Sequence, residues 1–326
     1  MSTKIPLRLH GLPTIIILLL SLAPPSSGAL EVGFYKGKCG FGDVESIVQG
    51  VVTAALKRDR TLVAALLRLH FHDCFVSGCD ASLLLDGSNS EKDAPPNLTV
   101  RGYDLIDAVK IQLEKTCPGV VSCADIIAMA TRDVVNWAGG GRYNVETGRR
   151  DAFQPANIID LPGPSISVKD SIAVFSKRNL SVTDMVYLLG GHTVGESQCI
   201  FFKDRLYNYK NTGGPDPTID DPFFLNDLQT QCPEDSGDEN TVFLDQNRMS
   251  SFIVDNSFHR QISRQRGILE IDQQLALDPL TKDLVSNVVF RSDFGFKFGQ
   301  AMIKMGRIQV LTGSLGEIRS TCAAVN

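Results

Sequence analysis

The sequence predicts an all-α protein whose helices are joined by long loops. Apolar residues recur three and four positions apart in many segments, as in Val44, Ile47, Val48 and Val51, and this spacing places them on one helix face. The segments between are rich in Gly, Pro and Asp, which favour turns. No run of alternating apolar and polar residues indicates a competing set of strands.

The helices can be placed in order along the chain. The first follows Asp43, a potential capping residue, and the second includes the apolar positions of segment 62–69. Ser122 and Ser167 are potential caps of two later helices. Further helices are predicted over 103–115, 122–136, 167–178, 183–189, 197–208, 279–290 and 292–306. Loops are predicted over 77–97, 139–164, 211–222 and 233–240.

Residues 1–29 have the layout of a secretory signal peptide. Lys4 and Arg8 precede the apolar run 15–20, and the small residues 27–29 follow it. The run is too short to span a bilayer, and no later segment reaches roughly 18 uninterrupted apolar residues. We therefore predict one domain over 30–326, exported to the extracellular space or cell wall in preference to the vacuole.

The overall composition is that of a globular protein. The chain has 326 residues, of which 43% are hydrophobic and 21% charged, so it can bury a large core. Its net charge of -5 gives no electrostatic reason to expect nucleic acid or an anionic membrane as partner. We expect a monomer that binds neither.

All eight cysteines lie beyond the predicted cleavage point. An even number in an exported chain favours four disulfides, although eight cysteines allow about 105 pairings, which spacing alone leaves open. A zinc site is the less favoured alternative, because there is no Cys-x-x-Cys pair and few histidines.

The most informative segment surrounds His72. Arg68 and His72 are four residues apart and share a helix face, with Phe71 beside them, whereas His70 points elsewhere. A guanidinium can stabilise developing negative charge and an imidazole can move a proton, and cleavage of a peroxide needs both. The structural alternative is a helix end with an incidental arginine and a core histidine.

A short loop follows this segment. Asp73, Asp80 and Ser82 supply two carboxylates and a hydroxyl around a glycine turn, with two cysteines close enough to bridge it by a disulfide. Hard oxygen ligands on a tight loop suit calcium. The alternative for each residue is a solvated loop position.

A second histidine, His192, lies between glycines in the segment 190–195, after a helix predicted from Thr183. The glycines would let a flat macrocycle approach the backbone closely. Taken alone, this pattern is more typical of a structural histidine.

Over residues 30–326 the sequence resembles the secreted plant peroxidases of class III. The stretch Arg68-Leu-His-Phe71-His72-Asp73-Cys74-Phe-Val-Ser-Gly-Cys79-Asp80 is similar to the family's distal motif, and residues 190–195 are similar to its proximal motif. The resemblance implies ten or more helices in two lobes that enclose haem b. It also implies an enzyme that reduces hydrogen peroxide to water while oxidising small phenolic donors by one-electron steps.

The resemblance assigns roles on the distal side. It makes His72 the base that takes a proton from peroxide and delivers it to the departing oxygen, and Arg68 the cation that steadies the charge, with Phe71 beside them. Asn97 would accept the hydrogen bond that keeps His72 in its basic tautomer. Asn97 also begins a glycosylation sequon, but a residue that serves His72 is buried, so we expect the glycan at Asn179.

On the proximal side the resemblance makes His192 the axial ligand of the haem iron. Asp272 would accept the hydrogen bond from its other ring nitrogen. Pro162 matches the proline at the exposed haem edge where aromatic donors dock, and its alternative interpretation is a simple loop proline.

Two calcium sites are also implied. The distal ligands would be Asp73, Val76, Gly78, Asp80 and Ser82, with Glu91 in the surrounding shell. The proximal site would use Thr193, Asp245 and Asp255, in a segment longer than the family's usual spacing. Ser250 is a candidate hydroxyl ligand there, whereas Arg248 is unfavourable beside a cation.

The family pairs its cysteines first with fourth, second with third, fifth with eighth and sixth with seventh. The resemblance therefore implies the pairs Cys39–Cys117, Cys74–Cys79, Cys123–Cys322 and Cys199–Cys232.

Two other classes of protein fit less well. An exported binding or structural protein could keep the fold after losing Arg68, His72 or His192, but all three are present. A secreted hydrolase would carry a Gly-x-Ser-x-Gly or His-Glu-x-x-His motif, and neither occurs.

Overall fold

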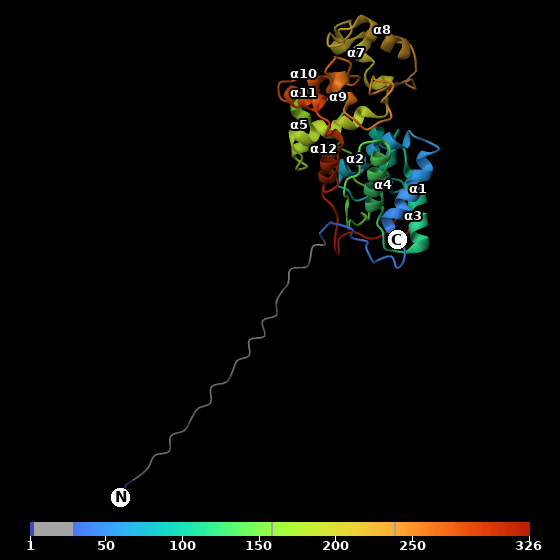
Figure 1. Cartoon of the computed structure of the whole chain (residues 1–326), viewed down its shortest axis with the longest axis vertical. Coiled ribbons are helices and arrows are strands. Elements are labelled where there is room, and N and C mark those ends of the chain that lie inside the picture. Colours follow the sequence, from blue (N-terminus) through green and yellow to red (C-terminus); the bar gives the residue numbers. More distant parts are fainter. Residues whose placement is uncertain (3–28, 158, 238) are drawn as a thin grey trace.

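A computed structural model describes residues 1–2, 29–157, 159–237 and 239–326. The predicted signal peptide falls almost entirely outside the described residues. The described domain is elongated, with α1 to α4 in one lobe and α7 to α11 toward the opposite end (Figure 1). The all-α prediction is confirmed, because the described elements are mostly helical and the strands are short.

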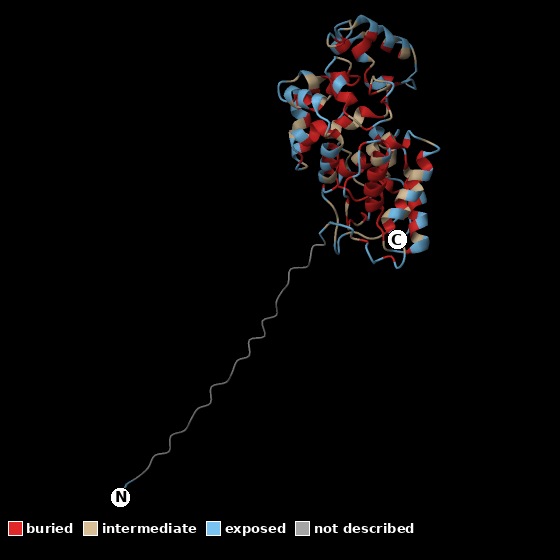
Figure 2. Cartoon of the chain, viewed as in Figure 1, coloured by how far each residue is buried: buried red, intermediate tan, exposed pale blue. Residues whose placement is uncertain are grey.

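The first lobe is built around α4. Helices α1 (Val44–Leu56), α2 (Leu62–Val76) and α3 (Tyr103–Thr116) pack with α4 (Cys123–Trp137). Every residue of α4 from Cys123 to Val135 is buried, which Figure 2 shows as a red central helix. A helix that is buried all round needs no polar face, and the sequence of α4 is apolar or small at most positions.

The second lobe contains shorter helices. They are α5 (Val168–Ser176), α6 (Val182–Leu189), α7 (Asp204–Tyr207), α8 (Pro222–Gln231), α9 (Ser257–Ile262), α10 (Glu270–Leu277), α11 (Lys282–Phe290) and α12 (Phe294–Met305). A separate apolar core lies beneath α7 and α8 and includes Phe202, Phe224 and Leu228. Among the described helices, none is both long and apolar enough to cross a membrane.

Two small antiparallel ribbons join distant parts of the chain. β1 (Glu31–Val32) pairs with β2 (Glu146–Thr147), and β3 (Glu196–Gln198) pairs with β4 (Thr241–Phe243). The predicted helix over 197–208 is therefore wrong: its first part is β3 and a 3-10 turn, and only α7 is α-helical. The Cys199–Cys232 disulfide and the bond from Cys199 N to Asn240 O hold this segment against β4.

The structure confirms two of the three potential capping residues named from the sequence. Ser122 and Ser167 each accept a hydrogen bond from a backbone N–H of the first helical turn. Asp43 precedes α1 but caps no backbone N–H, because its carboxylate accepts the Ser46 hydroxyl instead. Three helices were not predicted, namely α8, α9 and α10, and the last two span only six and eight residues.

Four disulfides join all eight cysteines, in the pairs that the family resemblance implies. The longest-range bridge, Cys123–Cys322, spans 199 residues and attaches the end of the chain to α4. Beside it, the buried Arg319 guanidinium donates to the carbonyls of Ala81 and Ala152. The C-terminal segment thereby holds the loop that follows α2.

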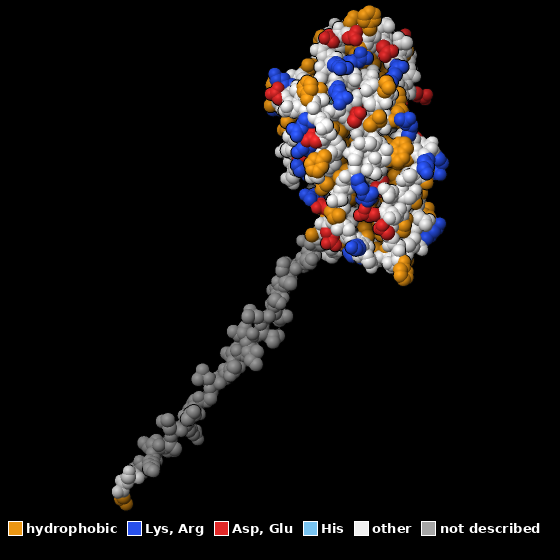
Figure 3. Space-filling model, viewed as in Figure 1, with side chains coloured by type: hydrophobic (Ala, Val, Ile, Leu, Met, Phe, Trp, Pro, Cys, Tyr) orange, Lys and Arg blue, Asp and Glu red, His pale blue; other side chains and the backbone are white. Residues whose placement is uncertain are grey.

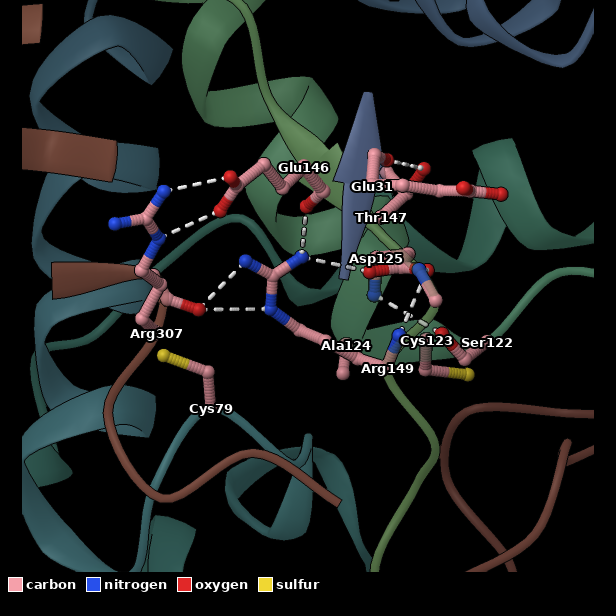
Figure 4. A network of polar contacts seen from close by, with 12 residues as sticks. Glu31, Cys79, Ser122, Cys123, Ala124, Asp125, Glu146, Thr147, Arg149 and Arg307 are labelled. Atoms are coloured by element: carbon pink, nitrogen blue, oxygen red, sulfur yellow. Dashed lines mark hydrogen bonds and ion pairs between the residues drawn. The ribbon is translucent and has the colours of Figure 1, made fainter. Parts of the chain in front are cut away.

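A buried ion pair lies at the base of the first lobe (Figure 4). Arg149 contacts Asp125 at 2.7 Å, and both side chains are almost fully buried. The guanidinium also donates to the carbonyls of Gly306 and Glu146. On the rim of this network, the half-exposed Arg307 forms a bidentate pair with the Glu146 carboxylate.

Candidate active site

Helix α2 carries Arg68 and His72 on one face, one turn apart. Arg68 Nε lies 3.2 Å from His72 Nε2. The same guanidinium donates to the Thr99 hydroxyl at 2.8 Å and to the Pro96 carbonyl at 2.9 Å. Arg68 is therefore anchored from a second segment as well as from its own helix.

The His72 ring is oriented by a chain of hydrogen bonds. His72 Nδ1 lies 2.6 Å from Asn97 Oδ1, and Asn97 Nδ2 donates to the Glu91 carbonyl at 2.8 Å. Because the Asn97 amide donates to that carbonyl, its oxygen faces the ring. His72 Nδ1 then carries the proton, and Nε2 keeps its lone pair.

The charge environment keeps His72 neutral. Burial and the nearby Arg68 cation lower the pKa of His72 to about 4, and the hydrogen bond to Asn97 opposes this shift only in part. A neutral imidazole beside a fixed cation can accept a proton over the whole neutral pH range.

His192 lies in the 3-10 turn Gly190–Thr193, which follows α6. Its Nδ1 is 2.9 Å from the Asp272 carboxylate, which is fully buried on α10. Burial lowers the pKa of His192, but the charge and hydrogen bond of Asp272 outweigh it and raise the pKa overall. The pair leaves His192 Nε2 as the ring nitrogen available to a ligand.

The two histidine segments approach each other. A Cβ added to Gly195 would lie 2.7 Å from Ala64 Cβ of α2, and Gly195 has a φ of +91°. The Arg68 cation is also close enough to act on the pKa of His192. The segment that carries Arg68 and His72 and the segment that carries His192 therefore lie close together.

These residues fit a haem. The His192 side chain is 30% exposed, although its partner Asp272 is fully buried. His192 Nε2 makes no hydrogen bond among the described residues, and an imidazole held by a carboxylate through its other nitrogen is a usual iron ligand. The two glycines before His192 do not open this turn to a macrocycle as the sequence suggested, because His259 and Phe294 lie against Gly190 and Phe298 lies against Gly191.

The distal calcium candidates converge on one buried cluster. Both carboxylate oxygens of Asp73, the Ser82 hydroxyl and Glu91 Oε2 are buried without a hydrogen-bond partner in the described chain. Burial, together with the charges of Asp80 and Glu91, raises the pKa of Asp73 well above its usual value. Buried oxygens without a hydrogen-bond partner, most of them on carboxyl groups, fit a hard cation.

The backbone candidates of this cluster lie where α2 ends. Val76 is the last residue of α2, and Gly78 follows with a φ of +115°. A Cβ at Gly78 would lie 2.5 Å from the Gln309 carbonyl, so only glycine fits.

The proximal calcium candidates differ, because their oxygens already have partners. Asp245 accepts hydrogen bonds from Asn247 N, the Ser250 hydroxyl and the Ser257 hydroxyl. The Thr193 hydroxyl contacts Asp255 at 3.2 Å. Arg248 is 74% exposed and faces Asp227, so it does not lie against this group. The predicted residues lie close together, but hydrogen bonds within the protein already satisfy their oxygens without a cation.

His70 and Phe71 lie beside the proposed distal residues on α2. His70 is buried near Cys74 and Cys79, but the two sulfurs form a disulfide and the three residues are no metal site. Phe71 is half-buried and packs on Phe75 with ring centroids 4.2 Å apart.

Pro162 is half-buried in the loop before α5. Two residues later, the Pro164 carbonyl accepts a hydrogen bond from Ile271 N, next to Asp272. The loop is thus tied to the proximal side of the site.

Thr99 was given no role in the sequence analysis, although it holds Arg68. Its position two residues after Asn97 was the available signal, but the threonine was interpreted only as part of a sequon. Asn97 itself is 1% exposed, whereas Asn179 is exposed with a φ of +59°.

Comparisons with known proteins agree with one another. A profile of the peroxidase family matches residues 48–290. The chain is 49% identical to Peroxidase 60 of Arabidopsis thaliana, over 95% of each chain. It is 46% identical to Peroxidase 57 of the same plant, over 95% of this chain and 97% of the relative. It is 41% identical to Peroxidase N1 of Nicotiana tabacum, over 96% of this chain and 95% of the relative.

Proposed function

This chain belongs to the class III family of plant peroxidases, haem enzymes that reduce hydrogen peroxide with electrons from donors, and we propose that His72, Arg68 and His192 carry this activity. The observation that supports these roles best is the pair of histidines, each with its Nδ1 held by a partner. In His72 the unprotonated Nε2 faces Arg68 Nε at 3.2 Å, and in His192 Nε2 makes no hydrogen bond among the described residues.

On the distal side, His72 acts as general base and then as general acid. Its Nε2 accepts a proton from hydrogen peroxide, and the resulting imidazolium donates that proton to the departing oxygen, which leaves as water. Asn97 keeps Nε2 unprotonated beforehand, and the low pKa of His72 makes the return of the proton favourable.

Arg68 stabilises negative charge on the oxygen that departs. Its guanidinium is held by Thr99 and Pro96, so little reorganisation is needed when the charge appears. Phe71 fills the adjacent wall and excludes water from this side.

On the proximal side, His192 binds the iron of haem b through Nε2. The haem, when bound, supplies the electrons that break the O–O bond and takes them back singly from donors. Asp272 increases the basicity of His192 by accepting a hydrogen bond from its Nδ1–H.

We propose small phenols as the donors, docking beside Pro162. Only an electron and a proton leave the donor, so a donor needs to reach the haem edge and no deep pocket is required. Broad selectivity follows from this, and two donor molecules are oxidised for each peroxide.

Calcium is proposed for the distal cluster of Asp73, Asp80, Ser82, Val76 and Gly78. The unpaired buried oxygens support it. The second, proximal ion at Thr193, Asp245 and Asp255 has weaker support, since protein hydrogen bonds already satisfy Asp245.

We propose export from the cell as a monomer. The four disulfides are typical of an oxidising compartment, and the exposed Asn179 is accessible to glycosylation. On the face seen in Figure 3, basic and acidic side chains are interspersed.

The test is a comparison of the wild-type protein with His72→Leu. Wild-type protein reconstituted with hemin and calcium is expected to show a Soret band and to oxidise a chromogenic phenol only when peroxide is added. His72→Leu is expected to keep the Soret band and to react with peroxide roughly 10²–10⁴-fold more slowly. Haem binding without turnover in the wild type would favour the binding-protein alternative.

A further inference from the structure

A cavity lies between α6, α11 and α12, and its lining does not include Arg68, His72 or His192. Its volume is about 180 Å³. Drug-sized ligands occupy pockets of about 300–1,000 Å³, so this cavity suits a single aromatic ring with a short side chain. The residues that line it are Thr183, Val186, Tyr187, Leu284, Asn287, Val288, Arg291 and Lys297.

The lining combines an aromatic and apolar interior with a basic rim. Tyr187 is 7% exposed, and Val186 and Val288 are buried beside it. Arg291 pairs with Asp293 at 2.8 Å, whereas Lys297 makes no ion pair among the described residues. A ring that carries a carboxylate would place its apolar face inward and its charge near Lys297.

Tyr187 is connected to His192 by a series of ring contacts. Ring centroids are 5.8 Å apart between His192 and Phe258, and 5.2 Å between Phe258 and His259. They are 5.6 Å apart between His259 and Phe294, and 5.9 Å between Phe294 and Tyr187. No step in the series exceeds the range of direct aromatic contact.

Gly190 allows this series to pass behind the proximal turn. A Cβ at Gly190 would lie 2.6 Å from His259 Cε1 and 2.9 Å from Phe294 Cε2. Any larger residue there would push the two central rings away from the backbone. The rings pack closely because this position, two residues before His192, has no side chain.

We propose that the cavity over Tyr187 is a second donor site, where a single-ring phenol bearing a carboxylate binds and gives one electron to the haem through Tyr187. The inference rests on the proposed role of His192. It goes beyond that role because it adds a donor site that does not use the Pro162 loop.

The electron count is that of one ordinary oxidation step. Peroxide is the oxidant, and the haem, when bound, would supply its oxidising power. Tyr187 gives up one electron through the ring series, and its hydroxyl proton passes to solvent in the cavity. The bound phenol then reduces Tyr187 by one electron and one proton. Its O–H bond breaks, and it leaves as a phenoxyl radical.

The first experiment measures binding in the absence of peroxide, with benzoate as the probe. Benzoate is expected to perturb the NMR signals of Tyr187, and Lys297→Gln is expected to weaken its affinity roughly two- to fivefold, as for a partly exposed ion pair. Lys282→Gln, on the exposed face of α11, is the control and should bind as the wild type does. Equal affinity in all three proteins would overturn the binding site.

The second experiment traps the radical. With hemin bound, peroxide added and no donor, a nitroso spin trap is expected to label Tyr187, as mapped by peptide mass spectrometry. Tyr187→Phe should remove that label. Tyr143→Phe, which removes a buried hydroxyl without a hydrogen-bond partner, should keep it.

The outcomes separate this inference from the proposed function. Peroxide consumption without a label on Tyr187 would overturn the electron route and leave the proposed function intact. A wild-type protein that consumes no peroxide would instead contradict the proposed function itself.

Discussion

Asn97 Oδ1 lies 2.6 Å from His72 Nδ1, and this contact decides which nitrogen of the proposed base is free. The two residues come from different segments, α2 and the 3-10 turn Pro95–Asn97. The position of the proton on His72 is therefore a property of the tertiary fold.

Replacing Asn97 by Val should slow the reaction with peroxide. The variant keeps similar bulk but cannot accept a hydrogen bond from the Nδ1–H of His72, so the imidazole loses its preferred tautomer. We expect the bimolecular rate constant to fall roughly 10–100-fold, as for other residues that orient active-site histidines. Stopped-flow spectroscopy of the Soret band measures it, and an unchanged rate would remove Asn97 from the mechanism.

Replacing Asp272 by Asn should retain haem but slow oxidation. The amide accepts a weaker hydrogen bond from His192, so the ligand becomes less basic. The expected results are a rise in the Fe(III)/Fe(II) reduction potential and a slower reaction with peroxide. The potential is the more specific measurement, because general damage to the fold does not predict a rise.

Removal of calcium should destabilise the protein through the distal cluster. Asp73→Asn is expected to lower the bound calcium, counted by atomic emission, by one ion per chain. At free calcium about 100-fold above its dissociation constant, one ion stabilises the fold by about 2.7 kcal/mol. Chelation should therefore lower the Tm of the wild type and have less effect on the variant. An equal Tm shift in both would argue against an ion at Asp73.

Two buried histidines that take no part in the proposed reaction with peroxide should make the protein sensitive to acid. Burial lowers the pKa of His70 to about 3 and that of His259 to about 4, both below the unfolded value of 6.5. Below about pH 6.5 the unfolded chain binds these protons and the folded one does not, so stability falls as the pH decreases toward the folded pKa values.

Each histidine should cost roughly 2 kcal/mol of unfolding free energy at about pH 4.5 relative to neutral pH. Urea denaturation of the wild type and His70→Leu at the two pH values measures the difference. The variant should show a smaller loss on acidification. Parallel losses in the two proteins would refute the assignment.

The ion pair between Arg149 and Asp125 offers a test of the fold that is independent of function. Arg149→Met leaves the Asp125 carboxylate buried without its cation, and we expect a loss of about 3–5 kcal/mol in unfolding free energy. Arg307→Met, on the exposed rim of the same network, should lose no more than about 1 kcal/mol. Similar losses of unfolding free energy in the two variants would mean that burial does not determine how much each ion pair contributes.

Local sequence patterns were sufficient to predict part of the secondary structure of this molecule. The helical spacing of Arg68 and His72 predicted their shared face, and periodicity predicted α3, α4 and α6 within a few residues. The segment 197–208 was misassigned because its apolar residues face a core formed by distant residues, and Cys199 is held by Cys232 and β4. Local periodicity contains no such information.

The candidate site also combines features that local sequence predicts with features that depend on the tertiary fold. That Thr99 binds Arg68, and that the rings of Phe294 and His259 connect Tyr187 with Phe258, follows only from the packing of separate segments. The resemblance to a family supplied the partner of His192, because nothing local relates residue 192 to Asp272, which lies on another helix.

The attachment of Arg319 and Cys322 to the first lobe bears on how the protein is made. The loop after α2 is held by Arg319 through the Ala81 carbonyl, and α4 is bridged to Cys322. During synthesis, α2 and α4 emerge long before these partners exist. The distal loop can therefore reach its final shape only after translation has passed Cys322, so a partly synthesised chain lacks a finished site for peroxide.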